Sequence, residues 1–130
     1  MTNKEEWHDR MAGDRHIKEM GIIVEEARLG YSKVSITIEE RHLNGLGVTN
    51  GGVVFSLADY AFGVASNAER GPSVGATVTI SFLRGTKTGD TLTAICTVDK
   101  QGSKIGFYDV DILDQSGNLI ATAKGTSCVI

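Results

Sequence analysis

The 130-residue chain is poor in proline, cysteine and aromatic residues: it has one proline, two cysteines and 6% aromatics. The cysteines, Cys96 and Cys128, lie 32 positions apart and no Asn-x-Ser/Thr acceptor accompanies them, so nothing indicates an oxidising compartment. No apolar run reaches the about 18 residues that a membrane-spanning helix needs. The first ten residues are polar and carry three carboxylates, unlike a signal peptide. We therefore expect a cytoplasmic protein without membrane contact.

An excess of basic charge is also lacking. The chain has 13 Lys and Arg against 16 Asp and Glu, a net charge of −3, which argues against a nucleic-acid partner. Hydrophobic residues make up 41% of the sequence, and a chain of this length buries roughly two-thirds of its unfolded surface. Because no repeat, low-complexity tract or linker divides the sequence, we expect one domain over residues 1–130.

Signatures of metal, nucleotide and serine-hydrolase sites are absent as well. His8, His16 and His42 have no partners at zinc-ligand spacing and are predicted to be exposed. The Gly-rich loop 42–52 fails the dinucleotide fingerprint at Asn50 and the phosphate-loop pattern at Val53. No Gly-x-Ser-x-Gly elbow is present. We therefore expect no metal and no bound cofactor.

The hydrophobic pattern predicts one long helix and several strands. Residues 53–67 are apolar around nearly the whole helix circumference, which indicates a helix enclosed by other structure. Residues 4–20 favour short helical pieces interrupted at Gly13. Alternation and turn signals predict strands over 22–24, 34–38, 74–83, 91–98, 105–113 and 119–129. The expected fold class is α+β, with an antiparallel sheet of five to six strands wrapped around the helix.

The start of the predicted helix, Asn50-Gly51-Gly52, is a candidate site. The first N–H groups of a helix lack intrahelical partners and together carry about half a positive charge. Two glycines there allow a ligand atom close to the backbone, the arrangement that stabilises an oxyanion. Ordinary capping by Asn50, with the glycines serving the turn, explains the same residues.

Asp59 is the second candidate, because it is the only carboxylate between Glu40 and Glu69. It shares one helix face with Ser56 and Gly63. On so apolar a helix it is expected to be buried, which would raise its pKa and suit a base or nucleophile. A buried structural aspartate is the alternative interpretation.

These residues resemble a known family. The run His42-Leu43-Asn44-Gly45, then Asn50 to Phe62, then Asn67, is similar to the phenylacetic-acid-degradation type of hotdog-fold acyl-CoA thioesterases. The resemblance implies a helix wrapped by an antiparallel sheet, assembled as dimers and often tetramers. It implies hydrolysis of acyl- or aryl-acyl-CoA to the acid and CoA. By this resemblance Asn44, Gly51 and Asp59 are catalytic, with Gly51 polarising the carbonyl.

Other positions are predicted to bind substrate. The family usually has His where this chain has Asn50, and asparagine can form hydrogen bonds and cap a helix but cannot ionise. The substrate-binding candidates are Asn50, Gly52, Thr77 and Arg84. Arg84, Lys87 and Lys104 are candidates for CoA phosphates, although each alone is more often a solvated surface charge.

Two expectations about the whole site follow. Gly51 and Asp59 are eight residues apart, about 12 Å along a helix, too far to serve one carbonyl within one chain. A homodimer that shares its active sites, and by resemblance a homotetramer, is therefore expected. The predicted function is acyl-CoA thioester hydrolysis. The alternatives are a non-catalytic acyl-CoA-binding domain and a dehydratase of the same fold.

Overall fold

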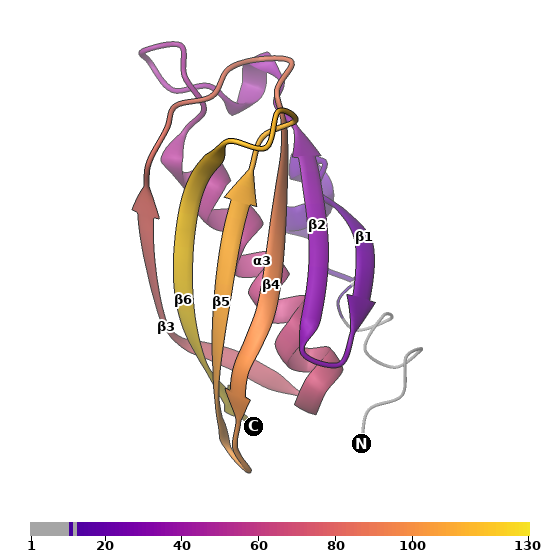
Figure 1. Ribbon diagram of the computed structural model, residues 1–130. Helices are drawn as coiled ribbons and strands as arrows, with labels where there is room; N and C mark the ends of the chain where they lie inside the picture. The colour runs from indigo at the N-terminus through magenta and orange to yellow at the C-terminus, as the bar shows by residue number, and fades with distance from the viewer. Residues whose placement is uncertain (1–10, 12) are drawn as a thin grey trace.

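The computed structural model describes residue 11 and residues 13–130 and has the predicted α+β architecture. Six antiparallel strands, in the order β1-β2-β4-β5-β6-β3, form a sheet that wraps around helix α3 (Figure 1). In chain order the elements are α2 (Arg15–Met20), β1 (Ile23–Arg28), β2 (Tyr31–Thr37), the 3-10 helix η1 (Glu40–His42), α3 (Gly51–Arg70), β3 (Ser73–Phe82), β4 (Thr91–Gln101), β5 (Ile105–Leu113) and β6 (Leu119–Val129). His8 and most of the segment predicted to form helical pieces before Gly13 lie outside the described residues.

Helix α3 is longer than predicted at both ends. It begins at Gly51 rather than residue 53, because Asn50 caps it, and it continues to Arg70 rather than ending at residue 67. It ends there because Pro72 disfavours the helical conformation in the preceding residue, Gly71. No helix among the described residues is long and apolar enough to cross a membrane.

The strands follow the predicted pattern most closely at the C-terminal end, where β5 and β6 have the expected bounds. Strand β1 runs over 23–28 rather than 22–24, β2 over 31–37 rather than 34–38, and β3 over 73–82 rather than 74–83. Strand β4 begins as predicted but continues to Gln101, past a register shift between Val98 and Lys100. Strand β3 does not pair with β4, which follows it in sequence. It lies at the edge of the sheet beside β6 (Figure 1).

The predicted enclosure of α3 is incomplete. The side toward the sheet is fully buried, with Leu57 and Ala61 both at 0% exposure. On another side, Gly52 and Asp59 are exposed and Ser56 is half-buried. The reason is that a curved sheet covers only part of a helix circumference, so a stripe of small and polar residues stays open.

Candidate active site

The start of α3 has one unpaired amide. The Asn50 side-chain Oδ1 accepts a hydrogen bond from the Gly52 N–H at 2.7 Å. The Asn50 carbonyl accepts from Val53 at 3.0 Å and Val54 at 3.3 Å. Among the described residues, the Gly51 N–H has no hydrogen-bond acceptor. Of the first four amides, only that of Gly51 remains available at the positive end of a 20-residue helix.

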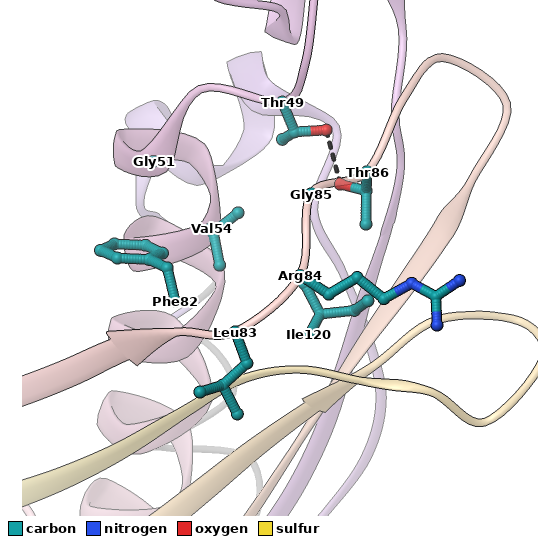
Figure 2. Close-up of a pocket in the computed structure, with 9 residues that line it drawn as sticks. All are labelled: Thr49, Gly51, Val54, Phe82, Leu83, Arg84, Gly85, Thr86 and Ile120. Atoms are coloured by element: carbon teal, nitrogen blue, oxygen red, sulfur yellow. Dashed lines mark hydrogen bonds between the residues drawn. The ribbon is translucent and has the colours of Figure 1, made fainter.

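A cavity of about 310 Å³ opens at this amide (Figure 2). Phe82, at the end of β3, lies beside Gly51, and a Cβ added at Gly51 would lie 3.5 Å from the Phe82 ring. Thr86, in the loop between β3 and β4, also lines the cavity, and its hydroxyl donates to the Thr49 hydroxyl at 2.7 Å. Arg84 also lines the cavity, and Figure 2 shows its guanidinium extending away from Gly51. A Cβ at Gly51 would make only an ordinary van der Waals contact with Phe82, so the cavity has room for alanine at this position.

Asp59 lines a separate cavity of about 310 Å³, together with Asp14, Ser56 and Ser73. The prediction that Asp59 is buried is wrong for the single chain, since its side chain lies on the open stripe of α3 and is exposed. Its pKa is nevertheless raised, first because nearby protein atoms remove part of its hydration and second because of the Asp14 charge. A carboxylate with a raised pKa is a better proton acceptor.

Asn44 has a structural task in the loop before α3. Its Oδ1 accepts hydrogen bonds from the Leu46 N–H at 2.9 Å and the Val48 N–H at 3.3 Å. Its backbone N–H donates to the Val48 carbonyl at 2.7 Å. These bonds close the turn that leads to Asn50. In the single chain, Asn44 lines neither the Gly51 cavity nor the Asp59 cavity.

Asn50 and Gly52 line a third hollow, a groove of about 640 Å³ beside α2. The Gly52 N–H is already bound to the cap, so it is not free to donate to a substrate. His42 also borders this groove, and its predicted exposure is wrong, because it is 4% exposed. It accepts from the Glu39 N–H at 2.9 Å and donates to the Met20 carbonyl at 2.9 Å, which joins α2 to the loop.

The remaining candidates lie in different parts of the molecule. Thr77 is exposed on β3 and lines a further hollow with Lys124, away from Gly51 and Asp59. Arg84 and Lys87 share the loop between β3 and β4, whereas Lys104 lies in the turn between β4 and β5, at the other end of the sheet (Figure 1). The structure therefore brings Arg84 to the Gly51 cavity and separates Lys104 from it.

Three neighbours of the candidate residues were not predicted: Asp14, Thr49 and Phe82. Asp14 had a usable signal, since an aspartate just before a helical segment is a typical N-cap. Thr49 and Phe82 had none, because only the fold brings the end of β3 and the loop after η1 to the start of α3.

Known proteins are similar to this chain in sequence and in architecture. Residues 46–121 match the thioesterase superfamily. Acyl-coenzyme A thioesterase PaaI of Escherichia coli K12 is 38% identical over 120 residues, which cover 92% of this chain and 86% of that protein. The structure of the E. coli PaaI protein, from the phenylacetic acid degradation operon, has a TM-score of 0.92 at 37% identity, covering 95% of this chain and 89% of that one.

A second solved structure contains a ligand. A thioesterase protein with coenzyme A from Streptococcus pneumoniae TIGR4 has a TM-score of 0.88 at 26% identity, covering 95% of this chain and 96% of that one. The match to the superfamily spans more than half of the sequence, and the E. coli relative aligns over nearly all of it. The chain belongs to the thioesterase superfamily, as a PaaI-like member with the hotdog fold.

Proposed function

We propose that the chain hydrolyses acyl-CoA thioesters to a free acid and CoA, at sites that two chains share. Family membership and the acyl-CoA thioesterase name of the E. coli relative support this activity. The coenzyme A in the S. pneumoniae structure supports CoA as the carrier of the acyl group. The observation that carries the proposal is the unpaired amide at the start of α3, that of Gly51, because this residue lines a cavity at the positive end of the helix.

In the proposed reaction, the Gly51 N–H binds the thioester carbonyl oxygen. As a water oxygen attacks the carbonyl carbon, Asp59 accepts a proton from that water, and negative charge develops on the oxygen held by Gly51. The tetrahedral intermediate then expels the CoA thiolate, which takes up the proton. Direct attack by Asp59 gives the same products through an acyl-enzyme anhydride. After turnover in ¹⁸O-labelled water, label in the Asp59 carboxyl would identify the anhydride route with attack at the Asp59 carbonyl, because the general-base route puts label only in the product acid.

The shared site rests on the place of the two cavities along β3. Gly51 and Asp59 are about 12 Å apart along α3, and they line different cavities. The Gly51 cavity includes Phe82, the last residue of β3, whereas the Asp59 cavity includes Ser73, the first. Antiparallel pairing of β3 with its copy would place the Phe82 end of one chain beside the Ser73 end of the other.

The two edges of the sheet support this pairing. Strand β1 is six residues long and carries three charged residues, as edge strands that avoid pairing usually do. Strand β3 is ten residues long and contains neither a charged residue nor proline. Its side chains are mostly exposed, including Val74 at 49% and Phe82 at 56%. An edge of this kind is suited to pairing with another chain.

The test begins with a panel of acyl-CoA substrates, assayed by thiol release. Two inactive variants, Asp59→Asn and Gly51→Pro, are then mixed under conditions of subunit exchange. A mixed dimer keeps one intact site, so activity should return to about a quarter of wild type at random assortment. Mixing Asp59→Asn with Asp59→Ala is the control and should stay inactive. If mass measurements detect the mixed dimer without activity, the shared-site model fails; if wild type cleaves no thioester, the activity itself fails.

A further inference from the structure

The segment before β1 partly covers the open stripe of α3. The Tyr60 hydroxyl donates to the Met11 carbonyl at 3.3 Å, and the His16 Nε2 lies 3.3 Å from the Ser56 hydroxyl. Ile17, the next residue after His16, is buried at 6% exposure and lines the Asp59 cavity. Met11 and His16 thus attach to α3 on both sides of Asp59 in sequence, through Tyr60 and Ser56.

This attachment places a second carboxylate in the Asp59 cavity. Asp14 is the N-cap of α2, where its Oδ1 accepts a hydrogen bond from the Ile17 N–H at 3.2 Å. The cap fixes the side chain, and Asp14 lines the same cavity of about 310 Å³ as Asp59. The Asp14 charge raises the pKa of Asp59, after the larger effect of lost hydration, and acts in the same direction on Tyr60.

Most of the other residues that line this cavity are uncharged. The other titratable residues that line the cavity are His16 and Tyr60. Strand β3 contributes Ser73, Val74 and Gly75, and α3 otherwise contributes uncharged residues. Among the described residues that line this cavity, Asp14 and Asp59 are the only carboxylates.

We propose that Asp14 is a positioning residue for Asp59, whose negative charge, held across the shared cavity by the cap of α2, makes Asp59 a better proton acceptor. This inference rests on the proposed role of Asp59 as the base of thioester hydrolysis. Like charges close together favour the proton-bound form of either group, so a carboxylate that faces another takes up a proton more readily. Asp14 thereby strengthens the base without contacting the substrate.

The variant Asp14→Asn isolates this effect. Asparagine caps a helix as well as aspartate does, so α2 keeps its start while the cavity loses one negative charge. The matched control is Glu19→Gln, which removes the same charge from α2 at a residue that lines the groove beside Asn50 rather than the Asp59 cavity. Both variants should melt within a few degrees of wild type.

Two measurements are made on each protein. Carbon NMR of labelled aspartate follows protonation of the Asp59 carboxyl, with Asp59→Asn identifying the signal. The pH dependence of kcat/KM is recorded in parallel. In Asp14→Asn, the Asp59 midpoint and the acid limb of the rate profile should both move to lower pH, and kcat/KM on the plateau should fall about threefold or less. Glu19→Gln should leave all three unchanged. High salt should reduce the difference in the Asp59 midpoint between wild type and Asp14→Asn, because salt screens the Asp14 charge.

An unchanged Asp59 midpoint in Asp14→Asn would overturn the inference. So would a lowered midpoint with an unmoved rate profile while Asp59→Asn is inactive, because Asp14 would then not act on the reaction. If Asp59→Asn itself keeps full activity, the proposed role of Asp59 as the base has failed, and the NMR midpoint still decides whether the two carboxylates are coupled.

Discussion

The two sides of α3 differ in composition and in what they contact. On the side toward the sheet, Leu57, Ala61 and Ala65 have no exposed surface and pack against the inward-facing side chains of the strands. On the open side, Gly52, Ser56 and Asp59 contribute little apolar area. Burial of apolar surface stabilises by roughly 25 cal/mol per Å², so the first side holds the fold together. The second is free to carry chemistry.

The buried side also fixes the geometry of the open one. The Ser32 hydroxyl on β2 donates to the Ala61 carbonyl at 2.5 Å. At the far end of α3, the Asn67 amide donates to the Gly63 carbonyl at 2.9 Å and exchanges two hydrogen bonds with the backbone of Ser73. These bonds join the helix to the first residue of β3. The positions of the Gly51 and Asp59 cavities at opposite ends of β3 are therefore set by the fold rather than by loops.

The largest effect on stability is expected on the sheet side. Leu57→Ala would leave a cavity in a site with 0% exposure and should lower the free energy of unfolding by about 2–5 kcal/mol. Because Leu57 lines neither the Gly51 nor the Asp59 cavity, kcat per folded molecule should change by less than about threefold. Denaturant melts and active-site-normalised kinetics test this. A stable but inactive Leu57→Ala would show that the side of α3 toward the sheet also contributes to catalysis.

At the helix start, Gly51→Pro removes the free amide and places a ring carbon where its hydrogen lay. Proline is favoured at the first helical position, and Asn50 already has the extended backbone (φ −60°, ψ 133°) that precedes proline. Loss of one oxyanion donor should lower kcat by about 10²–10³-fold while the melting temperature stays the same or rises. Gly51→Ala keeps the amide and is the control. Equal activity in the proline variant would remove Gly51 from the mechanism.

Asp59→Asn should lower kcat by at least about 10²-fold, the usual contribution of a general base. Its effect on stability has the opposite sign from that of Leu57→Ala. The folded chain raises the pKa of Asp59, so the ionised carboxylate is less favourable when folded, and the stability gained on protonation is lost as pH rises through the folded pKa. At neutral pH, Asp59→Asn should melt at or above wild type, and the difference should vanish in acid. Activity within threefold of wild type would contradict the assignment.

Much of the buried side could be predicted from the sequence, because it follows from local pattern. The alternation over 105–113 and 119–129 and the apolar run after Val53 are signals of period 2 and 3.6, and the structure confirms both strands and the helix. The two ends of the helix were missed, although the residues that decide them, the Asn50 cap and Pro72, are local signals. Strand order could not be predicted from local pattern, since β3 pairs with β6 and the strands β4 and β5 lie between them in sequence.

The open side was predicted only in part. The motif from Asn50 to Asp59 is local, so its residues were found, but the exposure of Asp59 depends on how far the curved sheet reaches around α3. Asp14 and Asp59 are 45 positions apart in sequence, and no periodicity relates them. The helical capping of Asn50 was one of two interpretations, and the structure shows that its side chain does cap α3.

The smallest effects on stability and activity are expected at Asn50, whose side chain caps α3 directly before Gly51. Asn50→Ala loses the bond to the Gly52 N–H and should cost about 1 kcal/mol of stability. Its kcat should fall only slightly, because the Gly51 amide stays free.

Asn50→Asp keeps the cap and adds a charge that the helix dipole favours, so it should be at least as stable as wild type. The same charge lies beside the amide at which an oxyanion would form, so kcat should fall more than in Asn50→Ala. Thermal melts and kinetics on the pair therefore separate capping from charge. If the alanine variant loses more activity than the aspartate variant, the Asn50 side chain itself contacts the substrate.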